Sequence, residues 1–445
     1  MKKIIAMVVS CLLVLPMALF AGCNGGGEND DEIEMWAGGQ WTGDDLQNLR
    51  EFINDFNADN ELGFTIKLTP KAELEVSLSA ALATGNAPDL LVWDRFNTPT
   101  YAKQDFLYPI DNLIAQDGID SSKYHEETWN ELNYEGKQYG LPLDLGYWGV
   151  YVNKDLVDEY NGTDEGKADP IDLSIEKWDW DQLYDTTVKL TKYNENGTLR
   201  QAGCSTTAIS EHIVSFYNST GKDFLGEDGM SDFNTPEFKA TLEFMKKMYD
   251  GKDGKKFSQN GMDDKTAFVN GQLAMIFQPN YFASYLEENA QDMEWVFMPQ
   301  PRYPGEGGVN GGMLGGFGLA IPNPQANTGT YPEEPTESML KAWEFMKWWA
   351  YDENNSLEWT KVSASFPSLL LLQTSEYIQS DPMMKTCADY AQYQKVRPSI
   401  PGWLFIQTNV FNINIPNYFA GNIGLQSVID KMTEDTDNTI LTYRK

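Results

Sequence analysis

Histidine and cysteine are scarce in this chain of 445 residues. There are two histidines, His125 and His212, and four cysteines, two of which fall within or directly after an apolar leader. The other two, Cys204 and Cys387, lie far apart and lack the CxxC or HxxxH spacing of metal ligands. We therefore expect no metal site and no histidine-centred catalysis. Export would allow a disulfide between Cys204 and Cys387, but we expect two buried free thiols.

Positive charge is also in short supply. The chain has 33 Lys and Arg against 66 Asp and Glu, a formal net charge of −33. Such a charge repels nucleic acids and anionic lipid surfaces, and it favours a soluble monomer. Abundant aromatic residues (22 Phe, 22 Tyr and 13 Trp) exclude a disordered or collagen-like chain, and the length predicts two or three domains.

Only one long apolar run occurs, at the start of the chain. Residues 1–22 combine Lys2 and Lys3, an apolar stretch and a small Ala21-Gly22 pair, which is typical of a signal peptide. The segment Leu19-Phe20-Ala21-Gly22-Cys23 resembles a bacterial lipobox, which implies lipidation of Cys23. Residues 23–31 would then form a flexible tether. Ordinary cleavage that leaves a free Cys23 is the alternative. With the lipobox, the protein is expected on the outer face of the cell membrane, or on the periplasmic side of a Gram-negative envelope.

The hydrophobic pattern predicts an α/β fold. Apolar strands at residues 33–37, 64–68 and 90–93 alternate with amphipathic helices at residues 44–57 and 71–84. This β-α-β-α-β order is typical of a parallel sheet with helices on both faces. Further strands are expected at residues 273–277 and 317–321, and further helices at residues 236–249 and 338–351.

Similar chemistry recurs where several of these strands end. Aromatic, glycine, amide and carboxylate residues gather in residues 36–41, 93–97, 144–148, 278–281, 315–317 and 398–403. Open α/β sheets bind ligands at the carboxyl ends of their strands. Aromatic faces pack on the apolar faces of sugar rings, and carboxylates and amides bond the hydroxyls. The alternative is that these aromatics belong to the core. No P-loop, dinucleotide fingerprint or GxSxG motif is present, so no cofactor is expected.

Several motifs in order carry a family resemblance. They are GNAPDLL (residues 85–91), FLYPI (106–110), YEGKQYGLP (134–142), YVNKDL (151–156), WDWDQL (178–183) and FVNGQLAM (268–275). Together they resemble the bacterial extracellular solute-binding protein family 1 of ABC importers, the maltose-binding-protein type. The resemblance implies a periplasmic-binding-protein type II fold, in which two α/β lobes are joined by a hinge and enclose a ligand cleft. It places residues 32–145 and 303–362 in the N-terminal lobe, and residues 149–298 and 370–445 in the C-terminal lobe.

The resemblance also suggests ligand-binding residues. Asp94 and Arg95 match an Asp-Arg pair that binds sugar hydroxyls in several members of the family. Tyr281 matches an aromatic residue that stacks on the sugar in the maltose-type proteins. Asp144 lies near the acidic residue of the first hinge, in a slightly different register. Trp41 and Trp403 are added because of their aromatic side chains, and the family resemblance does not point to them. The full expected set is Trp41, Asp94, Arg95, Asn97, Asp144, Tyr147, Trp148, Asn280, Tyr281, Gly316, Phe317 and Trp403.

The sequence thus predicts a non-catalytic lipoprotein that captures a mono- or oligosaccharide and delivers it to membrane permeases. Two other functions stay open. Asp94 and Asp144 could form the carboxylate pair of a glycoside hydrolase, or the chain could capture a non-sugar solute such as a polyamine. Asp94 and Arg95 could also be no more than a surface ion pair.

Overall fold

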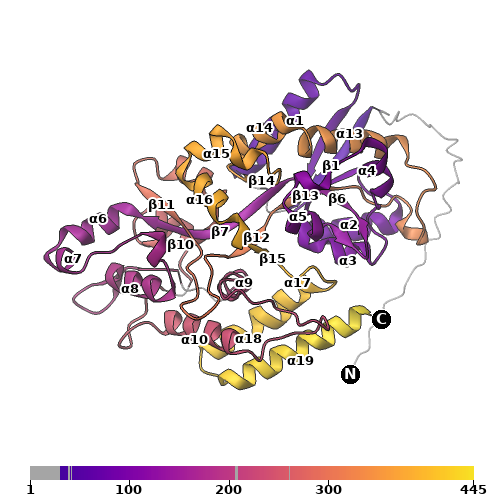
Figure 1. Ribbon diagram of the computed structural model, residues 1–445. Coiled ribbons are helices and arrows are strands. Elements are labelled where there is room, and N and C mark those ends of the chain that lie inside the picture. The colour runs from indigo at the N-terminus through magenta and orange to yellow at the C-terminus, as the bar shows by residue number, and fades with distance from the viewer. Residues whose placement is uncertain (1–30, 39–40, 42, 206–208, 260, 445) are drawn as a thin grey trace, which may run out of the picture.

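The computed structural model describes residues 31–38, 41, 43–205, 209–259 and 261–444 (Figure 1). The expected signal peptide, Cys23 and nearly all of the tether lie outside these residues. The described chain forms two α/β lobes, each built on its own sheet, with the long strand β7 (Asp144–Asn153) running from one to the other.

The first lobe contains a five-stranded sheet in the order β2-β1-β3-β13-β6. Strands β1 (Glu32–Ala37), β2 (Thr65–Pro70) and β3 (Leu90–Asp94) are parallel, as the β-α-β-α-β pattern predicts. Strand β13 (Phe317–Ala320) pairs antiparallel with β3, and β6 (Gly140–Pro142) pairs antiparallel with β13 at the edge of the sheet. The three parallel strands therefore end at the same edge of this sheet.

Helices cover both faces of this first sheet. Helix α1 (Gly43–Asp59) buries Leu49, Ile53 and Phe56 at helical spacing, and α2 (Leu74–Thr84) ends at Gly85, whose φ of 72° suits a glycine. The other helices of the lobe are α3 (Thr98–Ala102), α4 (Asp111–Asp117), α5 (Glu126–Glu131), α13 (Glu337–Ala350) and α14 (Glu353–Ser363).

The second lobe is organised around β7. Its outer half pairs antiparallel with β10 (Met275–Pro279) and β11 (Trp295–Pro299). Its inner half pairs with β12 (Met313–Gly315) and β14 (Phe366–Pro367), and β12 pairs in turn with β15 (Lys395–Val396). Two short strand pairs, β4 (Asn133–Tyr134) with β5 (Lys137–Gln138) and β8 (Lys192–Tyr193) with β9 (Leu199–Gln201), lie apart from the main sheets.

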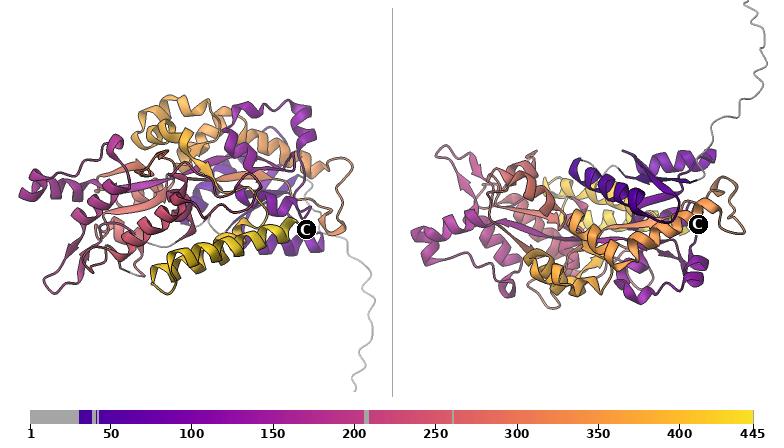
Figure 2. Two further views of the ribbon diagram at one scale, coloured as in Figure 1. Left: turned by 60° about the horizontal axis from the view of Figure 1, so that its bottom comes forward. Right: turned by 90° about the horizontal axis from the view of Figure 1, so that it is seen from above.

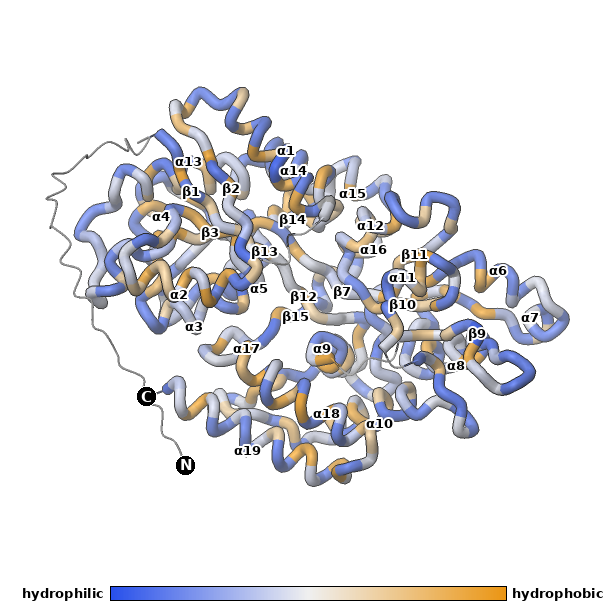
Figure 3. Tube along the Cα trace, turned by 180° about the vertical axis from the view of Figure 1, so that it is seen from behind, coloured by the Kyte–Doolittle hydropathy of each residue, from blue (hydrophilic) through white to orange (hydrophobic). Residues whose placement is uncertain are grey.

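Helices enclose the second lobe, and the longest of them, α19 (Leu425–Arg444), extends along one side of the molecule (Figure 2). Apolar and polar residues alternate along α18 and α19, as expected for helices with one buried face (Figure 3). The other helices are α6 (Lys154–Gly162), α7 (Asp164–Ala168), α8 (Trp180–Leu190), α9 (Ser210–Asn218), α10 (Pro236–Asp250), α11 (Asp264–Val269), α12 (Phe282–Asn289), α15 (Glu376–Ser380), α16 (Pro382–Tyr390), α17 (Trp403–Phe405) and α18 (Asn412–Phe419), with a π-helix at Ile406–Phe411.

The chain returns to the first lobe between β12 and β13, later than the sequence suggested. Tyr303 packs edge-on against Trp180 at 4.9 Å, and Met313 belongs to the core of the second lobe. The expected boundary at Tyr303 is therefore too early, because residues 303–315 follow the second lobe's sheet and core. The crossing itself occurs at Gly316, whose φ is 126°.

The two cysteines of the described chain are free thiols, as expected. Cys204 and Cys387 are fully buried and belong to different hydrophobic clusters. No helix in the described part of the chain is long and apolar enough to cross a membrane.

Candidate ligand-binding cleft

A small hollow of about 70 Å³ lies between the two lobes, beside the start of β7 and the start of β13. We call it the inner hollow. The first lobe supplies Trp41 and the start of α1, and the second lobe supplies Tyr281. The other lining residues belong to the three segments that cross between the lobes, at residues 144, 317 and 363–365. Its lining residues are Trp41, Asp45, Asn48, Asp144, Tyr281, Phe317, Ser363 and Ser365. The hollow therefore joins elements that are far apart in sequence, including four of the expected ligand-binding residues.

Three aromatic side chains form the apolar wall of the inner hollow. The rings of Trp41 and Phe317 lie 4.9 Å apart, and Trp41 also packs on Trp359 at 5.7 Å. Tyr281 enters from the turn after β10 and is half-buried. The indole Nε1 of Trp41 has no hydrogen-bond partner in the structure. Rings held by packing in this way present fixed apolar faces to a ligand.

Asp144 provides the carboxylate of the inner hollow. It begins β7 and is 4 % exposed. Its Oδ1 accepts a hydrogen bond of 2.9 Å from the backbone N–H of Phe317, and its Oδ2 accepts one of 3.3 Å from Nε1 of Trp359. Burial raises the pKa of Asp144, opposed by the bond from Phe317 and the charge of Arg95. The carboxylate is thus held in one orientation beside the aromatic wall.

A larger groove of about 550 Å³ continues from the inner hollow and shares Asp45, Asn48 and Tyr281 with it. We call it the outer groove. It runs between the start of α1, the end of α14 and helix α12 of the second lobe. Its other lining residues are Gly43, Lys265, Gln278, Phe282, Ser284, Tyr285, Glu287, Glu288, Gln291, Lys361, Val362, Ala364 and Tyr377. This volume falls within the range of about 300–1,000 Å³ that small-molecule sites occupy.

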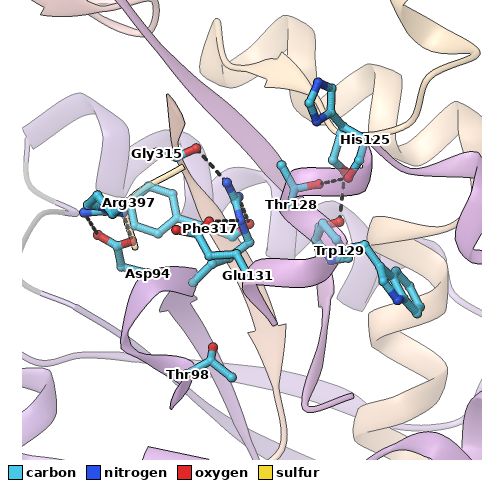
Figure 4. Close-up of polar contacts among 12 residues, drawn as sticks. Asp94, Thr98, His125, Thr128, Trp129, Glu131, Gly315, Phe317 and Arg397 are labelled. Atoms are coloured by element: carbon cyan, nitrogen blue, oxygen red, sulfur yellow. Dashed lines mark hydrogen bonds and ion pairs between the residues drawn. The ribbon is translucent and has the colours of Figure 1, made fainter. Parts of the chain in front are cut away.

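The alternative in which Asp94 and Arg95 form a surface ion pair is wrong, because Asp94 pairs with Arg397. Oδ1 of Asp94 lies 2.6 Å from Nη2 of Arg397, and Oδ2 lies 3.4 Å from Nη1 (Figure 4). The reason is geometric, because Asp94 ends a strand and successive side chains of an extended chain point to opposite sides. Sequence reasoning missed Arg397, which directly precedes the aromatic segment at residues 398–403 and has no local signal of its own.

Arg95 points into the interior and is out of reach of a ligand in this conformation. It is 0 % exposed, and its Nε donates to Oε2 of Glu131 at 2.9 Å. Its Nη atoms donate to the backbone carbonyls of Gly315 (2.7 Å), Phe317 (2.9 Å) and Asp144. The interpretations of Arg95 as a ligand-binding residue and as part of a surface ion pair are both wrong for this conformation. Instead it ties together the segments that cross between the lobes.

Two other expected residues lie in the core. Trp403 is 0 % exposed, because the first turn of α17 directs its ring onto Phe224 and Phe411 of the second lobe. Tyr147 is also fully buried and packs edge-on against Phe297 at 6.0 Å. Neither side chain borders the inner hollow or the outer groove.

Amides at two expected positions bond to the protein itself. Asn280 is fully buried, accepts a bond of 2.7 Å from the backbone N–H of Tyr147 and donates one of 2.9 Å to the carbonyl of Ala364. Asn97 donates to Glu75 at 3.2 Å. Both residues therefore support the fold around the cleft in this conformation.

Trp148 and Gly316 complete the expected set. Trp148 is half-buried and packs edge-on against His212 of α9. A Cβ atom at Gly316 would lie 2.4 Å from the carbonyl oxygen of Asp144 and 2.7 Å from Nη1 of Arg95. Gly316 is thus required by the close approach of the crossing segments rather than by a ligand.

The inner hollow is also lined by four residues that were not predicted from the sequence, namely Asp45, Asn48, Ser363 and Ser365. Asp45 and Asn48 could have been found, because they begin the helix that follows the first strand. Ser363 and Ser365 could not, since they reach the hollow only through the packing of α14 and β14.

Comparison with known proteins places the chain in a family. The family model "Bacterial extracellular solute-binding protein" matches residues 40–356. An arabinooligosaccharide-binding protein of Halalkalibacterium halodurans is 23 % identical over 287 residues, which cover 61 % of this chain and 58 % of that protein. A lactose-binding protein of Rhizobium radiobacter is 21 % identical over 322 residues, which cover 71 % of this chain and 70 % of that protein. The chain thus matches about three fifths of the length of the first of these curated relatives.

Solved structures show the same fold. An ABC substrate-binding protein of Listeria monocytogenes in complex with cycloalternan has a TM-score of 0.74 at 16 % identity, covering 92 % of this chain and 98 % of that one. The maltose/maltodextrin-binding domain of Bdellovibrio bacteriovorus bound to maltotriose also has a TM-score of 0.74. It is 17 % identical, and the match covers 92 % of this chain and 100 % of that one. Two α/β lobes around a hinge, together with a family match over most of its length, establish that this chain belongs to the bacterial extracellular solute-binding proteins.

Proposed function

We propose that this protein is the substrate-binding lipoprotein of an ABC importer, which captures a mono- or oligosaccharide between its lobes and delivers it to membrane permeases. The observation that carries the proposal is the inner hollow, where Trp41, Phe317 and Tyr281 surround the fixed carboxylate of Asp144. Aromatic faces beside a carboxylate and hydroxyl side chains suit a ring that has apolar faces and a polar edge.

The names of related proteins support a carbohydrate ligand. They include an arabinooligosaccharide-binding and a lactose-binding protein, and the matching structures hold cycloalternan and maltotriose. The family consists of binding proteins, so the hydrolase alternative has no support from it. The buried Asp144 and the Arg397-bound Asp94 also fit binding better than acid–base chemistry.

We assign ligand contact to Trp41, Asp144, Tyr281 and Phe317, together with Asp45 and Asn48 on α1. Direct roles for Asp94 and Trp148 remain predictions. Because both lobes contribute, the ligand would favour the arrangement in which they lie close together.

A thermal-shift screen tests the proposal. The purified protein is heated with panels of neutral mono- and oligosaccharides, with polyamines and with amino acids. A ligand that binds only the native state raises the melting temperature. We expect at least one saccharide to raise it and Tyr281→Ala to reduce that shift. A shift with polyamines alone, or none with any saccharide, would contradict the proposal.

The lipid anchor is a separate part of the proposal. It is supported by the position of Cys23 after Ala21-Gly22 and before the Gly-rich acidic segment. We expect Cys23→Ser to move the protein from the membrane fraction to the soluble fraction, whereas Cys204→Ser should not. A Cys23→Ser protein that resists a carbonate wash would rule the anchor out.

A further inference from the structure

One contact between the two lobes is a partly buried ion pair. Asp94 ends β3 in the first lobe, and Arg397 directly follows β15 in the second. The guanidinium approaches both carboxylate oxygens, at 2.6 Å and 3.4 Å (Figure 4). The side chain of Arg397 is 7 % exposed and that of Asp94 is 29 % exposed. Arg397 is thus almost fully shielded from water, and removing Asp94 would leave its charge without this partner.

Two neighbouring contacts cross the same boundary. The guanidinium carbon of Arg397 lies 3.8 Å from the ring centroid of Phe96. Phe96 belongs to the first lobe by sequence, yet it packs within the core cluster of the second. The backbone N–H of Gly402 donates to Oγ1 of Thr100 at 3.0 Å. Each of these contacts therefore joins one lobe to the other.

Two buried polar atoms near the ion pair lack hydrogen-bond partners. Its Nε has no hydrogen-bond partner in the structure, and neither does Oε1 of the fully buried Glu131. Both residues border a cavity of about 300 Å³ between α5 and residues 223–225 and 395–399. Burial raises the pKa of Glu131, opposed by the charges of Arg95 and Arg397. Without Arg397, Asp94 would lose its ion-pair partner, whereas Glu131 would keep Arg95.

We propose that Arg397 is a positioning residue that latches the two lobes together through Asp94. Separating the lobes breaks a charge-assisted pair and uncovers Phe96, so the pair favours the arrangement of the lobes described here before any solute is bound. Asp94 is therefore held primarily by the protein itself. The inference goes beyond the proposed function, since it concerns the ligand-free protein and does not depend on which solute is captured.

Small-angle X-ray scattering of the ligand-free protein tests the latch. The variants are Arg397→Met and the nearly isosteric Asp94→Asn, each first checked for cooperative thermal unfolding. We expect each folded variant to have a larger radius of gyration than the wild type, and the double variant to be no larger than either. In 1 M NaCl, the wild type should move toward the variants only slightly, because buried pairs are weakly screened.

Arg302→Met is the matched control. Arg302 pairs with Asp179 at 3.4 Å and donates to the carbonyl of Glu176, both within the second lobe. Its loss should leave the radius of gyration unchanged. If Arg397→Met does not fold, Asp94→Asn alone decides. A folded Asp94→Asn or Arg397→Met protein with the wild-type radius, or an equal expansion in Arg302→Met, would overturn the proposal.

Discussion

Arg95 and Glu131 form an ion pair in which neither side chain is exposed, with Nε and Oε2 separated by 2.9 Å. The same guanidinium donates to three carbonyl oxygens of the segments that cross between the lobes. Such a pair need not add stability compared with apolar residues, but removing one partner leaves a buried charge.

We therefore expect Arg95→Met to lower the free energy of unfolding by roughly 3–5 kcal/mol. Adding Glu131→Gln removes the uncompensated charge, so the double variant should recover part of this loss. Urea unfolding of the wild type, the two single variants Arg95→Met and Glu131→Gln, and the double variant measures the coupling free energy between the two residues. Additive losses would show that the two residues do not act as a pair.

Gly316 lies between the lobes with a φ of 126° and almost no space for a Cβ atom. Gly316→Ala should therefore destabilise the protein strongly. Gly329→Ala is the control, since its φ is 64° but no atom lies within 4 Å of the added carbon. Its expected cost is about 1–2 kcal/mol, that of the left-handed backbone alone. Equal melting temperatures for the two variants would contradict the close approach at Gly316.

Trp403 and Trp41 should differ in what their removal changes. Trp403→Ala is expected to cost about 3–5 kcal/mol of stability, because the ring fills the core of the second lobe. Trp41→Ala should weaken the binding of a saccharide found by the thermal screen by about tenfold, roughly 1.4 kcal/mol. Calorimetric titration and urea unfolding of both variants check this. Unchanged saccharide affinity in Trp41→Ala would remove that residue from the site.

Asp144 predicts a pH dependence of stability. Its pKa in the folded protein is raised above the ordinary 3.8. The folded state thus holds the proton more tightly, and this group's contribution to stability falls as pH rises from 3.8 through the raised value. In Asp144→Asn this decline is absent, so the variant should gain stability relative to the wild type as pH rises from 3.8 through the raised value.

Asp172 provides a control of opposite sign. Hydrogen bonds from Lys177 and Ser174 lower its pKa to about 2, so its contribution is lost as pH falls from 3.8 toward that value. Asp172→Asn should differ from the wild type in slope only below about pH 4. Parallel stability curves for Asp144→Asn and the wild type would contradict a raised pKa at Asp144.

Much of the fold could be predicted from local pattern. The first three strands, the helices between them and the end of α2 at Gly85 follow from hydrophobic periodicity and from glycine's freedom at positive φ. The lobe boundary at Tyr303 could not be placed in this way. Whether a loop follows one sheet or the other depends on long-range packing, here the contact of Tyr303 with Trp180.

The site was predictable to a smaller degree. Trp41, Asp144, Tyr281 and Phe317 come together because strand ends and crossing segments meet between the lobes. Arg95 shows the limit, since sequence cannot tell whether a side chain at a strand end faces solvent or the interior. An arginine beside an aspartate in the sequence suggests that the two form an ion pair. In the structure, the buried Arg95 pairs with Glu131 instead.

The two deeply buried thiols have a practical consequence. Cys204 and Cys387 are fully covered, and burial raises the pKa of both, so neither is expected to react readily. In a Cys23→Ser background, one cysteine introduced at the exposed Glu287 of the outer groove would be the preferred site for a thiol-reactive dye. A fluorophore attached there would report solute capture by a change in emission, which would make the protein a reagentless optical sensor for its ligand.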